Sequence, residues 1–220
     1  LNEVRFVDFT NRTLSGLNGK LVKSIKVGIC GLGTVAAGVV NVMQRNQAEI
    51  TARASCPVEI SIVGARSNNN ACDVSDYKVV EDIFAVVEDP AVDIVVELIG
   101  GIEPAKELIL KAIANGKHVV TANKALIAEH GNTIFAAAEA QKVNVWFEAA
   151  VAGGIPIIKA LREGLSANKI QWLAGIINGT GNFILSEMRD KGRQFGDVLA
   201  DAQQLGYAEA DPTFDVEGID

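Results

Sequence analysis

The sequence predicts an α/β protein built on a doubly wound parallel sheet, followed by a second, α+β region. Two observations predict this architecture. Short apolar runs alternate with longer segments of helical spacing from Ile25 to Glu148, and a glycine turn joins the first run to the first helical segment. Strands that alternate with helices of this length imply right-handed crossovers and a parallel sheet covered on both faces.

Five apolar runs are predicted to form the strands of this sheet. Each run is short and lies next to turn residues or a segment of helical spacing, as expected for a strand buried between two helical layers. The five runs are Ile25–Cys30, Val58–Ala65, Val92–Ile99, Lys117–Thr121 and Val143–Glu148.

Helical segments are predicted between these strands. Val35, Val39 and Met43 recur at helical spacing and indicate a helix that runs to about Ala54, ahead of Pro57. Pro104 suits the first turn of a later helix, and Gly116 suits its end. The remaining helices are predicted over Asp82–Glu88, Pro104–Asn115 and Gly131–Gln141.

The pattern changes after Glu148, where the small-residue turn Val151–Pro156 begins. We therefore divide the chain into an N-terminal tail or extension (1–23), a nucleotide-binding domain (24–150) and a second domain (151–220). The elements predicted in the second domain are a helix over Ile157–Gly164, a strand over Ile170–Ile177, and helices over Phe183–Arg189 and Phe195–Leu205.

The composition excludes several classes of partner and site. A formal net charge of −7 disfavours nucleic acid and anionic membranes as partners. Three cysteines without a CxxC spacing and two histidines cannot assemble an ordinary zinc site. No stretch approaches the ~18–20 apolar residues of a membrane span. This composition is typical of a reduced, cytoplasmic protein.

The glycine turn has the features of a Rossmann-type dinucleotide fingerprint. Gly31 permits the tight turn, Gly33 permits close approach of a pyrophosphate, and Ala36 is small enough for helix–strand packing. The pyrophosphate would lie at the amino terminus of the helix. The alternative is a purely structural turn. The candidate cofactor-binding residues here are Gly31, Leu32, Gly33, Thr34 and Val35.

The end of the second strand indicates which dinucleotide binds. Enzymes that use NAD usually place a carboxylate there for the ribose hydroxyls, but this chain has Arg66 and Ser67, and no acid before Asp73. Arg66 can pair with a 2′-phosphate, which favours NADP(H) and leaves NAD(H) possible. The alternative is that Arg66 is only a solvated loop residue.

An acidic turn closes the sequence. Glycine and proline interrupt it, so a long helix cannot absorb its carboxylates. Such a cluster can bind an ammonium group or a metal ion, and the alternative is a solvated acidic loop. Its acids are Glu209, Asp211, Asp215, Glu217 and Asp220.

Four stretches of the chain together resemble homoserine dehydrogenase. They are Gly31–Val35, Val96–Gly101 (VELIGG), the pair Thr121–Lys124 (TANK) with Phe147–Pro156 (FEAAVAGGIP), and the run A-x-x-x-G-Y-A-x-x-D-P-x-x-D-V-x-G-x-D that ends at Asp220. Members of this family reversibly reduce L-aspartate 4-semialdehyde to L-homoserine with NAD(P)H, on the route to threonine, methionine and isoleucine. The resemblance implies that 151–220 is an incomplete substrate (catalytic) and dimerisation domain, and that the full-length protein is a homo-oligomer.

The same resemblance assigns roles to single residues. Lys124 is expected to line the nicotinamide and substrate region, serving both cofactor binding and catalysis. Glu209 is expected to bind the substrate ammonium, with Asp215 and Asp220 beside it, and Asp220 is also assigned to the catalytic site. The family's proton-donor lysine would lie four residues beyond Asp220. We therefore expect the 220-residue chain by itself to bind cofactor and turn over little substrate.

The resemblance also implies a monovalent-cation site, for Na⁺ or K⁺, at Glu148, Val151, Gly153 and Ile155. The alternative for this stretch is a simple hinge between domains.

Two positions depart from the family pattern. Ala36 stands at the usual third glycine, and Gly181 stands where Thr or Ser is common, so Asn178–Asn182 is assigned only a general role.

Two rival functions were considered. An acylating aldehyde dehydrogenase needs a cysteine nucleophile after the nucleotide domain, whereas all three cysteines lie before residue 73 and none follows. That rival is excluded. The other rival, an NADP(H)-binding module without turnover, stays open at this point.

Overall fold

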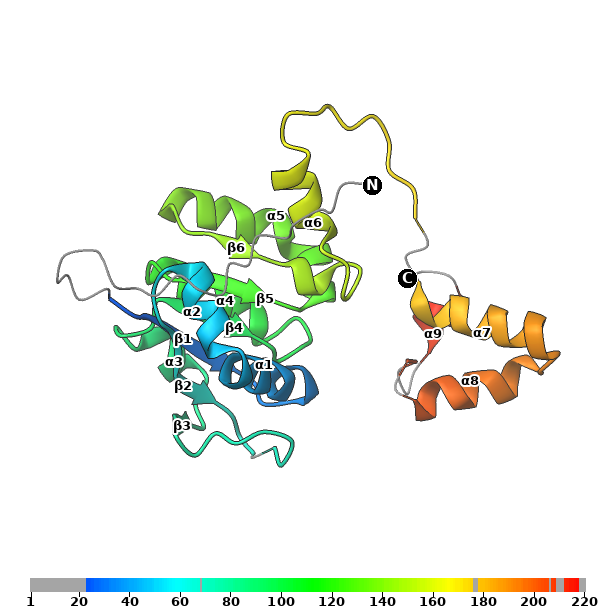
Figure 1. Ribbon diagram of the computed structural model, residues 1–220, viewed down its shortest axis with the longest axis horizontal. Helices are drawn as coiled ribbons and strands as arrows, with labels where there is room; N and C mark the ends of the chain where they lie inside the picture. The colour runs from blue at the N-terminus through cyan, green and yellow to red at the C-terminus, as the bar shows by residue number, and fades with distance from the viewer. Residues whose placement is uncertain (1–22, 68, 176–177, 206, 209–211, 218–220) are drawn as a thin grey trace, which may run out of the picture. The chain divides into compact units, whose positions relative to one another are not determined.

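A six-stranded parallel sheet forms the centre of the larger part of the protein (Figure 1). The computed structural model describes residues 23–67, 69–175, 178–205, 207–208 and 212–217. All pairings are parallel and the strand order is β3-β2-β1-β4-β5-β6, which confirms the predicted Rossmann-type sheet. The strands are β1 (Ile25–Cys30), β2 (Val58–Gly64), β3 (Lys78–Val80), β4 (Ile94–Glu97), β5 (His118–Thr121) and β6 (Val145–Trp146).

Helices connect all of these strands except β2 and β3, which a loop joins, and further helices follow in the second part of the chain. Those of the sheet-containing part are α1 (Thr34–Arg45), α2 (Gln47–Ala54), α3 (Phe84–Glu88), α4 (Ala105–Ala114) and α5 (Lys124–Gln141), followed by the 3₁₀ turn η2 (Glu148–Ala150), α6 (Ile157–Lys159) and the π-helical turn η3 (Ala160–Gly164). The later helices are α7 (Gly179–Lys191), α8 (Phe195–Gln204) and α9 (Thr213–Val216).

Alternate side chains of the strands enter two separate hydrophobic cores. On β1, Val27 and Ile29 pack with Ala36 and Val40 of α1. Cys30 belongs to the opposite core, which α3, α4 and α5 cover. Because both faces of the sheet are covered by helices, its strands read as nearly continuous apolar runs in the sequence. This arrangement leaves the strand ends as the places where polar groups gather.

Several elements differ from the sequence predictions. The first helix is interrupted at Asn46, so α1 and α2 replace one helix. The short strand β3 was not predicted. α5 begins at Lys124 and not at Gly131, because the Asn123 side chain accepts a hydrogen bond from Leu126 N and caps the helix there.

The predicted strand over Ile170–Ile177 is wrong over its described residues. Residues 170–175 have no regular secondary structure, and no strand of the described ranges pairs with them. A strand is held by hydrogen bonds to a partner, so an apolar run alone does not make one. Trp172 is 78% exposed, and its neighbours are exposed as well.

The described residues separate into two compact units, which divide between Arg162 and Glu163. In the second unit, α7 and α8 pack through Ile184, Val198 and Ala202. Thr180 is buried and donates its hydroxyl to the carbonyl of Tyr207 at 2.7 Å. Over the ranges that the structure describes, no helix has both the length and the apolar character needed to cross a membrane.

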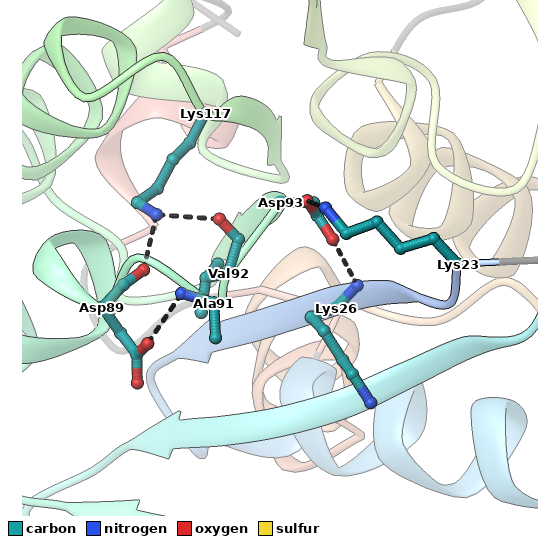
Figure 2. Close-up of polar contacts among 7 residues, drawn as sticks. All are labelled: Lys23, Lys26, Asp89, Ala91, Val92, Asp93 and Lys117. Carbon is teal, nitrogen blue, oxygen red and sulfur yellow. Dashed lines mark hydrogen bonds and ion pairs between the residues drawn. The ribbon is translucent and has the colours of Figure 1, made fainter.

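Polar contacts link the amino ends of β1, β4 and β5 (Figure 2). Lys117, just before β5, is 5% exposed and donates to the carbonyls of Asp89 (2.6 Å) and Val92 (2.8 Å). The Asp93 carboxylate accepts from the backbone of Lys26 in β1 at 2.9 Å and pairs with Lys23 at 3.2 Å. The segment before β4 is thereby joined to both neighbouring strands.

Candidate dinucleotide-binding site

The glycine turn leaves β1 at the point where the order of the strands reverses. β1 has β2 on one side and β4 on the other, and ligands of open α/β sheets bind at the carboxyl ends of strands at such a switch point. Gly31 has a φ of +97°, and a Cβ placed on it would lie 2.6 Å from the carbonyl oxygen of Leu98. Only glycine fits this turn without distortion.

Gly33 immediately precedes α1 and has a different environment. A Cβ placed on Gly33 would meet no described atom within 4 Å. The amino terminus of α1 therefore presents an open surface, and no acidic side chain lies in its first turn. Free amides and the helix dipole at such a terminus favour a phosphate group. Ala36 is fully buried, as expected for the small third position of the fingerprint.

Arg66 and Ser67 follow β2 and are both exposed. The segment is held in place by a hydrogen bond from Ala65 N to the carbonyl of Val80 at 2.8 Å. Asn69 also donates to the carbonyl of Leu32 at 3.1 Å, so the loop after β2 contacts the glycine turn. An exposed cation thus lies on a loop that is tied to the turn.

A cavity of about 800 Å³ lies elsewhere. Its lining comes from α1 and residues 69–79, and it includes none of the predicted site residues. Asn41 and Gln44 of α1 cross it to bond the carbonyls of Ala71 and Asp73, both at 2.9 Å. We regard it as the space beneath a loop and not as the cofactor site.

Glu97, at the end of β4, is a site residue that the sequence reasoning missed. Its side chain is fully buried, and Oε1 accepts hydrogen bonds from the amides of Ile99 (2.8 Å) and Gly100 (3.3 Å). Oε2 accepts from the hydroxyl of Thr121, at the end of β5, at 2.6 Å. A single acid at the end of an otherwise apolar strand was the available signal.

Asn123 continues this network toward Lys124. Its amide nitrogen donates to the carbonyl of Gly101 at 2.6 Å, and its backbone N–H donates to the Thr121 hydroxyl at 3.0 Å. Lys124 is the first residue of α5 and is exposed. The carboxyl ends of β1, β4 and β5 thus bring together the glycine turn, the loop 98–101 and the start of α5.

Glu148 lies in the first unit, at η2. Its two carboxylate oxygens accept hydrogen bonds from the amides of Ile158 and Lys159, each at 2.8 Å. The backbone that follows is irregular, with positive φ at Ala152 and Gly154. The carbonyls of Glu148 and Ile155 each accept one amide, from Val151 (3.2 Å) and Ile157 (2.8 Å).

The acidic turn is only partly described. Glu209 and Asp220 lie outside the described residues, and the backbone of Asp215 lies in α9. Among the described residues no cluster of three His, Cys, Asp or Glu side chains is arranged to hold a metal ion. The substrate-binding assignments therefore stay predictions.

Two family models match the chain. The model for the NAD-binding domain of homoserine dehydrogenase matches residues 31–148, and the model for homoserine dehydrogenase itself matches residues 156–220. Similar curated proteins include the homoserine dehydrogenases of Pseudomonas aeruginosa (67% identical over 199 residues) and Neisseria gonorrhoeae (57% over 208 residues). Each match covers 90% of this chain and 46% of the relative. The chain therefore spans about half the length of the curated relatives it matches.

Solved structures of the same kind are similar to the chain in fold. The homoserine dehydrogenase of Thiobacillus denitrificans is similar with a TM-score of 0.83 and 64% identity, over 90% of this chain and 46% of that one. A hyperthermophilic archaeal homoserine dehydrogenase in complex with NADPH is similar with a TM-score of 0.76 and 26% identity, over 90% of this chain and 66% of that one.

Proposed function

Because the chain belongs to the homoserine dehydrogenase family and carries its nicotinamide-dinucleotide-binding domain, we propose that the protein reversibly reduces L-aspartate 4-semialdehyde to L-homoserine. The observation that carries the proposal is the glycine turn at the switch point of the sheet, with the open amino terminus of α1 beside it. When bound, the nicotinamide supplies or accepts the hydride. The residues of the chain bind, orient and exclude water around it.

The protein residues have distinct parts in this proposal. Gly31 and Gly33 admit the pyrophosphate to the amides of α1, with Leu32, Thr34 and Val35 beside it. Lys124 contributes a positive charge at the start of α5 toward the nicotinamide and substrate region. Glu209, Asp215 and Asp220 accept hydrogen bonds from the substrate ammonium, because a zwitterion is oriented by acceptors at its amino end. We also propose, by family membership, that the complete protein is a homo-oligomer.

We propose that NADP(H) is preferred to NAD(H), and an Arg66 variant tests this preference. The loop after β2 offers an exposed guanidinium and no carboxylate before Asp73, so a 2′-phosphate is attracted and not repelled. NADPH should bind more tightly than NADH in fluorescence titrations of this chain. Arg66→Ala should narrow the gap, and Arg53→Ala, which removes an exposed arginine of α2, should leave it unchanged. Equal or tighter binding of NADH by the unaltered chain would refute the Arg66 assignment.

A hydride-transfer assay of the complete gene product tests the reaction and the substrate site. Homoserine should reduce NADP⁺, and Glu209→Gln should weaken homoserine binding by ~1–3 kcal/mol through loss of a charge-assisted hydrogen bond. NADPH binding should not change, and Glu139→Gln, at the exposed end of α5, serves as the charge-matched control. Cofactor binding without any turnover would favour a binding module, and unchanged homoserine saturation in Glu209→Gln would refute that residue's role.

We propose further that the stretch from Glu148 to Ile155 holds Na⁺ or K⁺. A carbonyl oxygen has two lone pairs, so the carbonyls of Glu148 and Ile155 each retain one after accepting an amide. Val151 and Gly153 would supply further carbonyls. Hard monovalent cations suit such neutral oxygen ligands. The same assay in tetramethylammonium chloride should show lower activity than in KCl or NaCl, and equal activity in all three salts would contradict the site.

A further inference from the structure

Glu97 needs a physical explanation, because burying a carboxylate costs several kcal/mol unless hydrogen bonds compensate it. The side chain has no exposed surface, so it does not itself reach a bound ligand. Its three contacts, from two backbone amides and one hydroxyl, are all donated to the carboxylate. An ionised carboxylate is an acceptor only, so these contacts match its needs.

The contacts of Glu97 close into a ring of hydrogen bonds. One oxygen holds the amides of Ile99 and Gly100, and the other holds the Thr121 hydroxyl. That hydroxyl accepts from Asn123 N, and the Asn123 side chain donates back to the carbonyl of Gly101 at 2.6 Å. The loop after β4 and the start of α5 are therefore joined at two points, with Glu97 and Asn123 as the two links.

The ring lies against the glycine turn. Leu98, the first residue of the loop, bonds Cys30 O through its amide at 2.8 Å, and its carbonyl borders Gly31. Asn123 also caps α5 by accepting from Leu126 N at 3.1 Å, so α5 begins at Lys124. One buried carboxylate thus determines the position of two segments that border the proposed cofactor site.

We propose that Glu97 is a positioning residue whose carboxylate, acting through Thr121, couples the loop 99–101 to the amino terminus of α5. The two segments then respond to the cofactor as one unit. This inference rests on the proposed cofactor site. It goes beyond that proposal because Glu97 and Thr121 are fully buried and would act without touching the cofactor.

Replacement of Thr121 tests the coupling in the full 220-residue chain. Thr121→Val keeps the shape of the side chain and removes the hydroxyl that joins the two halves of the ring, whereas Thr121→Ser keeps the hydroxyl. NADPH affinity, measured by fluorescence titration, should fall about tenfold in Thr121→Val. In Thr121→Ser it should stay within about threefold of the affinity of the unaltered chain. Thermal melting of both variants shows that each remains folded at the temperature of the titration.

Hydrogen exchange distinguishes coupling from a merely structural role, because loss of a structural contact alone would not alter which segments NADPH protects. In the unaltered chain, NADPH should slow amide exchange both in 99–101 and in 123–126. In Thr121→Val, NADPH should slow exchange in only one of these segments. If Thr121→Val does not fold, Thr121→Ala makes the same test, since it also removes the hydroxyl and is smaller than valine.

The outcomes separate the two proposals. NADPH binding that is unaffected by Thr121→Val, with both segments still protected together, overturns the inference and leaves the proposed function intact. A chain that binds neither NADPH nor NADH overturns the proposed function, and this inference with it. Loss of affinity in Thr121→Val with recovery in Thr121→Ser, together with protection of a single segment, supports the coupling.

Discussion

Gly31→Ala should lower the free energy of unfolding by about 2–4 kcal/mol and remove measurable NADPH binding. The backbone at Gly31 has a φ of +97°, where a side chain is strained. The added Cβ would lie 2.6 Å from the carbonyl oxygen of Leu98. That oxygen belongs to a backbone held by the hydrogen bond from Leu98 N to Cys30 O, so it cannot swing aside like a flexible side chain. The turn must therefore shift as a whole.

Gly33→Ala is the matched control, because it should separate binding from stability. Gly33 has a φ of −80°, and its added Cβ meets no described atom within 4 Å, so we expect a loss of at most about 1 kcal/mol, which comes from the poorer capping of α1 by alanine. The methyl group would enter the space proposed for the pyrophosphate and weaken NADPH binding by at least about tenfold. Urea denaturation and NADPH titration of both variants check this pair. Binding equal to that of the unaltered chain in Gly33→Ala would show that no phosphate approaches there.

Lys117→Met should lower the free energy of unfolding by about 2–4 kcal/mol. The Lys117 ammonium is buried and donates to the carbonyls of Asp89 and Val92, and hydrogen bonds from a charged donor are stronger than neutral ones. Methionine fills a similar volume and donates nothing. Lys23→Met is the control in the same cluster (Figure 2). The Lys23 side chain is 85% exposed, so loss of its ion pair with Asp93 should cost at most about 0.5 kcal/mol.

The cost of Lys117→Met should also depend on pH. Burial lowers the pKa of the Lys117 ammonium, and the nearby Asp89 and Asp93 carboxylates partly oppose this. The unfolded chain then holds the proton more tightly than the folded protein, so the cost of burying the charge is present below the folded pKa. That cost disappears as the pH rises toward the ordinary value of 10.5. The stability gap between the unaltered chain and Lys117→Met should therefore widen as the pH rises through the lowered pKa of the folded state toward 10.5. A gap that narrows over this range, in urea denaturation, would show that burial of the charge is not what is being measured.

The strands at the centre of the sheet could be predicted closely from the sequence, because burial on both faces leaves an unbroken apolar run. β1 was predicted to the residue, and β2 to within one residue. β3 was missed because it is only three residues long and two of them, Lys78 and Val79, are exposed. An edge strand of this kind depends on its neighbour β2 and carries little signal of its own.

Errors in the helices and in the second unit have a different physical origin. Asn123, a good cap residue, signals the start of α5, whereas the helix was predicted only from Gly131. That glycine lies inside the helix and is buried. The run over Ile170–Ile177 has the composition of a strand, yet strand formation needs a partner that is chosen by contacts distant in sequence.

The residues of the candidate site also differ in how well the sequence alone could predict them. The glycine turn is encoded within six consecutive residues, so its position and its open amino terminus could be predicted locally. Glu97 could not be assigned in this way, because its role arises where β4, the loop after it and the end of β5 meet. The roles of Glu209 and Asp220 stay predictions, since both lie outside the described residues.

The burial of Cys30 gives the protein an internal reporter of its own opening. Its thiol has no exposed surface, and burial, with a smaller contribution from the Glu97 charge, raises its pKa to about 12. Since only the thiolate reacts with alkylating reagents, Cys30 stays unlabelled while the sheet is closed. Cys56 and Cys72 are partly exposed and are the thiols open to labelling in the native state. The time at which a third label is incorporated therefore records when the helices α3, α4 and α5 first separate from the face of the sheet that carries Cys30, without any engineered probe.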